Sequence, residues 1–337
     1  MKAVAVPEPG RLEVVEIATP EIQDYECLVK MRACGLCTGT DPKVLHGKVG
    51  GPGRYPFILG HEGVGEVVEV GSKVRTWQVG DLVTDPGVRL PAPYKANCGH
   101  FAEYGIAQDF EVMDELGIEE RAFRASCTLK IPRDIPAVDA PVLLTLKENY
   151  SALTNFGFQP GMSVLLFGDG PVGLGLVSLL HLRGAGWVTA VGHWDDRLAR
   201  LRDIGGANQV VNTKTESLDA ALAGREFDLV IDAVGSSAII REATRRVRNG
   251  GKVCLYGVMK HDDCTLSVRE HFRNNTSLHV LQWPNGEFEV HDEVVAMVLE
   301  GKVDLKNYYT HVMPVDAIAE AFAMVARREA YKVIVTF

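Results

Sequence analysis

The pattern of hydrophobic and polar positions changes near residue 150. Before it, short β-rich runs are separated by Gly, Pro and Asp, a pattern typical of strands joined by turns. Strands are expected at Ala3–Val6, Leu12–Glu16, Glu26–Ala33 and Gly63–Val70. The first part of the chain is therefore predicted to be an all-β, barrel-like region.

After residue 150, short apolar runs alternate with segments of helical period, which predicts a parallel sheet covered by helices on both faces. Strands are expected at 163–167, 187–191, 209–212, 228–232, 251–256 and 277–281, and helices at 171–183, 197–204 and 238–248. Two more helices, 290–300 and 315–327, precede a closing strand at 331–337. Residues 110–126 are acidic and lack a clear period, so we expect an inserted surface excursion there.

Composition narrows the class of protein. The 337 residues suffice for two domains. The net charge of −9 argues against binding to nucleic acid, which needs clustered Lys and Arg. No apolar run approaches the roughly 20 residues that span a bilayer, and no secretory signal is visible at the start. Seven cysteines, an odd count, favour reduced thiols. We therefore expect a soluble cytoplasmic protein without nucleic-acid or membrane partners.

Residues 164–173 read VLLFGDGPVG, a buried strand that runs into G-x-G-x-x-G and then a helix. Gly168 allows the tight turn, Gly170 lets backbone approach a pyrophosphate, and Gly173 lets the helix pack on the strand. The helix that begins at Pro171 and Val172 offers free N–H groups to the phosphates. This context predicts a nicotinamide dinucleotide site.

The end of the second strand predicts the type of dinucleotide. NAD enzymes carry Asp or Glu there to bind the ribose 2′-OH, but this chain has Gly192. Without that carboxylate, His193 or Arg197 could bind a 2′-phosphate, which favours NADP over NAD. Asp195 and Asp196 would partly repel the same phosphate, and the alternative is that Asp195 only caps the helix and both cofactors bind.

A candidate metal site lies in the first part of the chain. Cys37, His61 and Glu62 could supply the three N, S or carboxylate ligands that a catalytic zinc needs, if their loops meet. The alternative for a lone His in a Gly-rich turn is a structural hydrogen bond. Cys34 and Cys37 have C-x-x-C spacing, but no second C-x-x-C follows, so a four-cysteine structural zinc is not predicted.

Taken together, these motifs resemble the zinc-dependent alcohol dehydrogenase branch of the medium-chain dehydrogenases, over nearly the whole chain. GHEGVGEVVEVG, highly specific to that family, is followed by GDGPVG in the family's order. Further matching stretches are VGDLV (79–83), GHFAEY (99–104), APVLL (140–144), IDAVGS (231–236), NGGKVCLYGV (249–258) and GKVDLKNYYTH (301–311).

The resemblance implies an α/β protein with a GroES-like β-rich catalytic domain and a Rossmann doubly wound sheet. The expected domains are 1–150 for catalysis, 151–286 for NAD(P), and a C-terminal segment, 287–337, that returns to the catalytic domain. It also implies small-molecule alcohol or carbonyl substrates, and a homodimer or homotetramer. The strand at 277–281 looks like the sheet edge through which relatives pair.

Site roles also follow from the resemblance. Cys37 and His61 fall on catalytic zinc ligands, and Glu62 on the acid of polyol-dehydrogenase-like members. Thr40 resembles the hydroxyl residue that takes the substrate proton, and Phe101 falls where the family lines its substrate pocket. The residues implied to lie beside the cofactor are Ala233, Val234, Tyr256 and Val258, with Lys332 near the pyrophosphate.

Several positions depart from the family pattern. The run from Cys37 to Asp41 is one residue longer than usual, so Thr38 or Thr40 could be the relay hydroxyl. Lys43 stands where a relay His is common. Leu144 stands where the family often has a third zinc ligand, so the site would use Glu62 and water, recruit Glu148, or lack metal. The lobe that normally carries structural zinc keeps only Cys98, and no structural zinc is expected.

We therefore expect an NAD(P)-dependent alcohol dehydrogenase of the polyol or sugar type, with one catalytic zinc that acts as a Lewis acid. One alternative is a metal-free enone or quinone reductase, favoured by Leu144 and discriminated by metal content. Another is a non-catalytic protein on the same fold, as lens crystallins show the fold permits.

Overall fold

The computed structural model describes residues 1–49, 53–121, 127–260, 262–263, 265–272 and 275–337. They form two compact units, one of Met1–Leu144 with Tyr309–Phe337 and one of Thr145–Tyr308. The boundaries expected from the sequence, after 150 and after 286, differ from this division. Helix α9 (His291–Leu299) belongs to the second unit, and the chain returns to the first at Tyr309.

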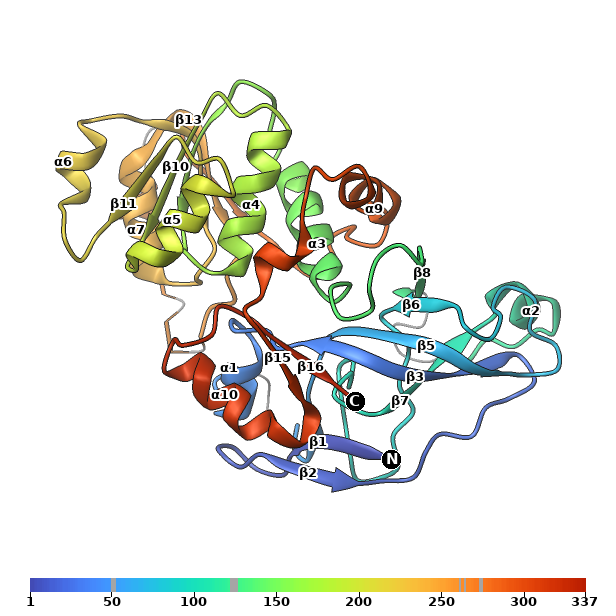
Figure 1. The fold of residues 1–337 in the computed structure, drawn as a ribbon. Helices are drawn as coiled ribbons and strands as arrows, with labels where there is room; N and C mark the ends of the chain where they lie inside the picture. Colours follow the sequence, from blue (N-terminus) through green and yellow to red (C-terminus); the bar gives the residue numbers. More distant parts are fainter. Residues whose placement is uncertain (50–52, 122–126, 261, 264, 273–274) are drawn as a thin grey trace. The chain divides into compact units, whose positions relative to one another are not determined.

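The first unit is built on a seven-stranded sheet whose path runs β15-β16-β3-β5-β6-β8, with β7 paired to β3 (Figure 1). All pairs are antiparallel except β15 with β16. The strands are β3 (Glu26–Gly35), β5 (Glu62–Val70), β6 (Leu82–Thr84), β7 (Tyr104–Gln108), β8 (Leu129–Ile131), β15 (His311–Pro314) and β16 (Val333–Thr336). A second sheet has the order β2-β1-β4, with β1 (Lys2–Val6), β2 (Glu13–Glu16) and β4 (Phe57–Ile58).

The long strand β3 organises this unit, because β5, β7 and β16 all pair with it. Its apolar side chains enter two cores. Cys27 and Val29 pack with Val67 and Val83, while Cys34 joins a core closed by the C-terminal segment. That segment contributes η3 (Val315–Ala317), α10 (Ile318–Ala326) and β16. The predicted strands of the first region are confirmed, with β3 and β5 slightly longer than expected.

Residues 110–126 were expected to form a surface excursion without a regular period, and this is wrong for their first part. Phe110–Glu115 forms helix α2, which begins at Asp109, whose carboxylate accepts the Val112 N–H at 3.3 Å. Met113 is fully buried. The short helix exposes too few turns to show a period in the sequence. Residues 122–126 lie outside the described residues.

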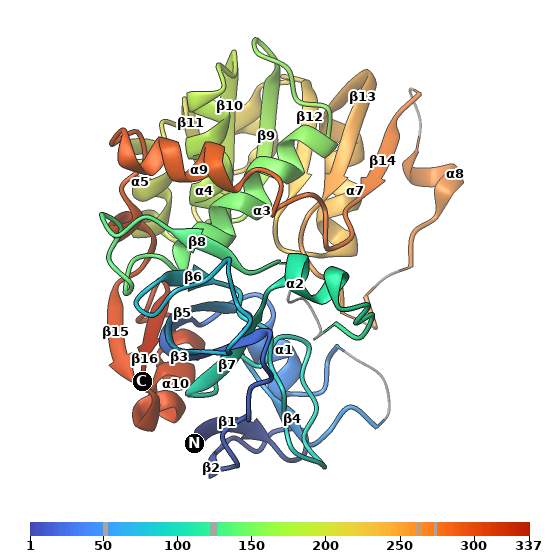
Figure 2. The same ribbon diagram turned by 90° about the vertical axis from the view of Figure 1, so that its right-hand side faces the viewer.

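The second unit is a six-stranded, all-parallel sheet with the order β11-β10-β9-β12-β13-β14 (Figure 2). Each half of the sheet steps outward from the centre, the doubly wound order in which a dinucleotide binds at the carboxyl ends of the strands. The strands are β9 (Ser163–Phe167), β10 (Trp187–Gly192), β11 (Gln209–Asn212), β12 (Phe227–Asp232), β13 (Val247–Leu255) and β14 (Ser277–Val280). All six predicted strands are confirmed.

Helices connect these strands. They are α3 (Val142–Asn155), which enters the unit, and then α4 (Pro171–Leu182), α5 (Asp195–Asp203), α6 (Leu218–Leu222), α7 (Ser237–Arg246), α8 (Val268–His271) and α9. The interior of α4 is apolar on nearly all sides, so the sheet and the neighbouring helices bury it. No helix among the described residues is long and apolar enough to cross a bilayer.

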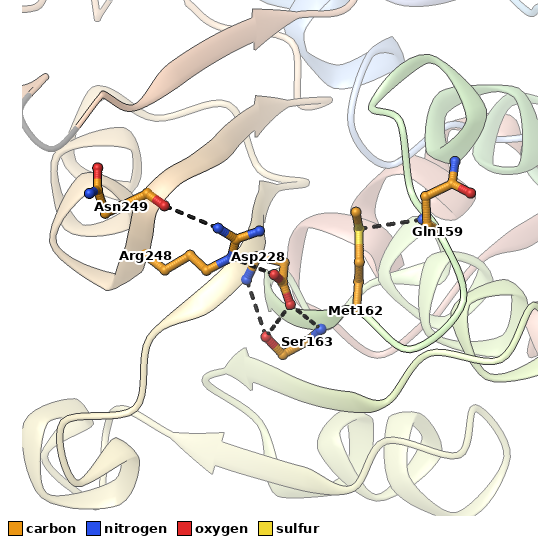
Figure 3. Close-up of polar contacts among 6 residues, drawn as sticks. All are labelled: Gln159, Met162, Ser163, Asp228, Arg248 and Asn249. Atoms are coloured by element: carbon orange, nitrogen blue, oxygen red, sulfur yellow. Dashed lines mark hydrogen bonds and ion pairs between the residues drawn. The ribbon is translucent and has the colours of Figure 1, made fainter.

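A polar cluster holds the amino ends of β9, β12 and β13 together (Figure 3). Asp228 Oδ2 accepts the N–H and Oγ–H of Ser163 at 2.7 and 2.8 Å, and Asp228 Oδ1 accepts from Arg248 Nε at 2.5 Å. Nearby, the Gln159 N–H points to the sulfur of Met162 at 3.4 Å. Burial opposes ionisation of Asp228, but the bonds from Ser163 and Arg248 outweigh it and lower its pKa.

Asp228→Asn should therefore destabilise the second unit by about 1–2 kcal/mol, because the charged bond to Arg248 is lost while the amide oxygen still accepts from Ser163. A carboxylate with a lowered pKa stabilises the fold above its unfolded pKa of about 3.9 and loses that effect as the pH falls through the folded value. Urea unfolding at pH 7 and pH 3 should show the difference between variant and wild type at pH 7 shrinking at pH 3. An equal difference at both pH values would contradict this account.

Candidate metal centre and dinucleotide site

Three predicted ligands meet in the first unit. Cys37 follows the end of β3, His61 immediately precedes β5, and Glu62 opens β5. The Cys Sγ, a His ring nitrogen and a Glu carboxylate oxygen all lie within 4.8 Å of one another. A tetrahedral zinc with bonds of about 2.0–2.3 Å separates its ligand atoms by about 3.3–3.8 Å. The donor set and its spacing therefore fit a zinc ion after small adjustments.

Strand register brings these residues together. Gly35 and Glu62 are opposite partners in the β3–β5 pair, so the loops that carry Cys37 and His61 leave the sheet at the same place. A Cβ at Gly35 would lie only 2.1 Å from Glu62 Oε2. The missing side chain at Gly35 thus provides the space in which the Glu62 carboxylate lies.

Asp41 supports two of the three candidate ligands, a role that the sequence pattern did not indicate. It begins α1 (Asp41–Leu45), and its side chain is 2% exposed. Its Oδ2 accepts the Cys37 N–H at 2.9 Å, and its Oδ1 lies 3.5 Å from His61 Nδ1. A carboxylate beside one ring nitrogen orients the other toward a metal. Burial disfavours a charged His61, yet its pKa is raised because Asp41 and Cys37 favour the imidazolium.

Lys332 forms a buried ion pair with Glu62, with side chains 3% and 5% exposed. Lys332 directly precedes β16, which pairs with β3. The resemblance implied a place near the pyrophosphate for Lys332, whereas the structure places its ammonium on Glu62. Glu62 therefore has a cation beside it already, and a metal would share or replace that partner.

The two cysteines of the C-x-x-C spacing have different surroundings. Cys34 is fully buried in the apolar core of the first unit, and that burial raises the pKa of its thiol well above the usual value. Cys37 is partly exposed beside His61. Only Cys37 belongs to the ligand group, so the spacing does not mark a two-cysteine metal site.

The residues that departed from the family pattern can also be placed. Thr40 precedes α1 but makes no side-chain capping bond, while its carbonyl accepts the Val44 N–H at 3.0 Å. Leu144 is buried, with 4% of its surface exposed, and has no group that could bind a metal. Glu148, the proposed substitute ligand, accepts a hydrogen bond from the Tyr256 hydroxyl at 3.2 Å. Phe101 is fully buried in the same core as Cys34.

The glycine turn of the second unit has the geometry that the sequence predicted. Gly168 has a φ of +132°, which favours glycine, and a Cβ at Gly173 would lie 2.1 Å from the Gly168 carbonyl oxygen. At Gly170 an added Cβ would meet nothing within 4 Å, so this side of the turn is open to a ligand. Helix α4 begins there with Pro171 and has no side-chain cap, which leaves its first N–H groups for phosphate.

A second turn at the carboxyl edge of the sheet depends on Asp232, whose role the sequence pattern did not indicate. This buried residue ends β12, and its carboxylate accepts the N–H groups of Val234, Gly235 and Ser236 at 2.8–2.9 Å. Its carbonyl accepts the Tyr256 N–H at 2.9 Å. Asp232 thereby fixes the loops that carry the remaining predicted cofactor residues, which are Ala233, Val234, Tyr256 and Val258.

A carboxylate from outside β10 lies at the end of this strand. Gly192 ends the strand, as predicted, and lacks a side chain. Asp169, from the glycine turn, reaches this point, and its Oδ2 accepts the N–H groups of His193 at 2.8 Å and Trp194 at 3.2 Å. His193 is exposed, and Arg197 lies in the first turns of α5.

Comparison with known proteins agrees with this architecture. Residues 171–299 match the family described as zinc-binding dehydrogenase, and residues 23–116 match the alcohol dehydrogenase GroES-like domain. Sorbitol dehydrogenase of Bacillus subtilis is 25% identical over 99% of this chain and 97% of its own. A probable zinc-binding alcohol dehydrogenase of Mycobacterium tuberculosis is 30% identical over 97% of this chain and 86% of its own. The solved structure of an alcohol dehydrogenase from Thermus sp. ATN1 aligns with a TM-score of 0.80 at 25% identity, covering 100% of this chain and 99% of that one.

The two units are thus a GroES-like β-rich domain and a Rossmann-type dinucleotide fold, the architecture of a nicotinamide-dependent oxidoreductase. The chain belongs to the zinc-binding alcohol dehydrogenase family and is an oxidoreductase. The GroES-like match extends to residue 116, so residues 110–116 are part of the family's domain rather than an insertion.

Proposed function

We propose that this chain is a zinc-dependent dehydrogenase of a polyol or sugar hydroxyl that uses a nicotinamide dinucleotide. The observation that carries the proposal is the convergence of Cys37, His61 and Glu62 within 4.8 Å. Among the described residues no fourth His, Cys, Asp or Glu joins this Cys–His–Glu set, which leaves coordination positions for substrate and water. The similarity to sorbitol dehydrogenase supports the polyol class.

Each residue of the metal centre has a distinct task in this proposal. Cys37, His61 and Glu62 would hold a zinc ion, which polarises the substrate oxygen when bound. Asp41 keeps His61 oriented through Nδ1 and fixes the Cys37 backbone. Thr40, whose hydroxyl makes no capping bond, would relay the hydroxyl proton of the alcohol, since its Oγ1 would accept that proton while its own proton passes to solvent.

The second unit would bind the dinucleotide, which supplies the hydride acceptor or donor. Gly168, Gly170 and Gly173, with the α4 N-terminus at Pro171 and Val172, would bind the pyrophosphate. The loops fixed by Asp232 would bind the nicotinamide half, since the second half of a doubly wound sheet serves that mononucleotide.

A metal-free enone or quinone reductase is the second candidate. The buried Leu144 and the Glu62–Lys332 ion pair favour it, because neither requires a metal.

Metal content together with turnover tests the proposal. We expect about one zinc per chain in purified protein, oxidation of a polyol from an alcohol panel, and loss of that activity on chelation with recovery on adding zinc back. Zinc well below one per chain, with enone reduction intact after chelation, would overturn the zinc assignment in favour of the second candidate.

We also infer a homodimer or homotetramer that forms through β14. This strand is the edge of the parallel sheet, and Val280 on it is 47% exposed. Light scattering tests this, and a monomeric mass would contradict it.

We also propose a cytoplasmic location. Six described cysteines are free thiols, which supports it.

A further inference from the structure

Gly192 and Asp169 form a matched pair at the end of β10. A Cβ built at Gly192 would lie 2.5 Å from Asp169 Oδ2, 2.6 Å from its Cβ and 2.8 Å from its Cγ. No side chain fits at position 192 while Asp169 keeps this conformation. The absence of a side chain at Gly192 therefore leaves the space that the Asp169 carboxylate occupies.

The end of the second strand binds part of the nucleotide in folds of this type. In doubly wound dinucleotide folds, an acid at the end of the second strand binds the adenosine ribose, and the glycine turn after the first strand binds the pyrophosphate. In this chain β9 is the first strand and β10 the second. Asp169 stands in the glycine turn, yet its carboxylate lies where the side chain of residue 192 would begin.

We propose that Asp169 supplies the missing acid, binds the ribose 2′-OH and makes this chain select NAD over NADP. The inference rests on the proposed use of a nicotinamide dinucleotide. It reverses the preference for NADP that the sequence indicated, because that preference depended on the absence of a carboxylate at the end of β10.

The backbone orients this carboxylate. Asp169 Oδ2 accepts the N–H groups of His193 and Trp194, which fixes the plane of the carboxylate. Its Oδ1 has no hydrogen bond among the described residues and can accept from a ribose hydroxyl. A carboxylate held in this way cannot turn aside from a 2′-phosphate, which carries a charge of about −1.5 to −2.

Three basic residues stand around this turn, Lys214, His193 and Arg197. Lys214 lies over the Trp194 ring, 3.2 Å from its centroid, so its ammonium already has a partner. His193 and Arg197 lie close in sequence to acidic residues at the start of α5. Asp195, whose Oδ1 accepts from Asn212 Nδ2 at 2.6 Å, and Asp196 add further negative charge at the start of α5. A 2′-phosphate at this turn would therefore lie in a region that carries three acidic residues, Asp169, Asp195 and Asp196.

Equilibrium binding tests the proposal without requiring turnover. NADH and NADPH are titrated into the full-length protein, and binding is followed by nucleotide fluorescence. We expect NADH to bind at least about tenfold tighter than NADPH to the wild type, since one charged hydrogen bond and one repulsion separate the two ligands. Equal or tighter binding of NADPH would overturn the inference, whereas failure of both dinucleotides to bind would overturn the proposed function instead.

Two variants separate ribose binding from a purely structural role. Asp169→Asn keeps an oxygen that accepts from His193 and Trp194 but removes the charge. We expect the NADH preference to fall by about tenfold at an unchanged Tm. The double variant Asp169→Gly with Gly192→Asp moves the carboxylate onto β10 and should restore the preference, while Gly192→Asp alone collides with Asp169. An unchanged NADH-to-NADPH ratio in folded Asp169→Asn would show that the carboxylate only supports the turn.

Discussion

Replacing His61 by alanine is expected to lower kcat/KM for alcohol oxidation by about 10³-fold or more. The imidazole is one of three groups within 4.8 Å that can hold a metal, and its Nδ1 is already oriented by Asp41. Lewis-acid stabilisation of the developing alkoxide contributes several kcal/mol, and each 1.4 kcal/mol corresponds to tenfold in rate. Steady-state kinetics and zinc content per chain, measured on the same preparation, check this together.

The matched control is His46→Ala, since His46 is an exposed histidine that follows α1 in the same unit. It should keep full zinc content and activity. NADH titration is a second control, because the glycine turn of the second unit should bind the dinucleotide equally well in both variants. A His61→Ala protein with full zinc and undiminished kcat/KM would exclude His61 from the metal centre.

Local sequence predicted the strand, the glycine turn and the helix of the second unit well. Strand β9 was placed at 163–167 and has those bounds in the structure. The close approach of Gly173 to the Gly168 carbonyl shows why the pattern is so constrained. A strand, a tight turn and a helix N-terminus within a dozen residues restrict each position by local sterics, so one sequence suffices to recognise them.

The meeting of Cys37, His61 and Glu62 was predictable for a different reason. Cys37 and His61 are distant in sequence, but both flank long strands that were themselves predicted, β3 and β5. The resemblance supplied the pairing that spacing alone left open. No local pattern showed the role of Asp41. Its carboxylate accepts the Cys37 backbone N–H and lies beside His61 Nδ1.

The contacts that sequence reasoning missed are those between elements. Lys332 and Glu62 are 270 residues apart, and only the pairing of β16 with β3 brings them together. Asp169 follows β9 and Gly192 ends the neighbouring strand β10. Their close approach depends on the pairing of these strands, so the sequence alone does not show that the Asp169 carboxylate lies beside Gly192. Hydrophobic period predicts which face of a strand is buried, but it does not predict which polar groups meet at strand ends.

Lys332→Met should destabilise the metal-free protein by about 3–5 kcal/mol, because it leaves the buried Glu62 carboxylate without its cation. The double variant Lys332→Met with Glu62→Gln removes both charges and should recover much of that loss. Urea unfolding after chelation measures each free energy. Lys302→Met is the control, because its ion pair with Glu300 is more than half exposed and contributes about 0–1 kcal/mol.

Adding zinc should reduce the loss of stability caused by Lys332→Met. If Glu62 is a ligand, the ion supplies the positive charge that Lys332→Met removes, so zinc should stabilise the variant more than the wild type. The thermodynamic reason is that a ligand stabilises the folded state according to its affinity for it, and removing a competing cation raises that affinity. An equal gain from zinc in both proteins would show that Glu62 is not a ligand, so that in the wild type it stays paired with Lys332 while other groups hold the metal.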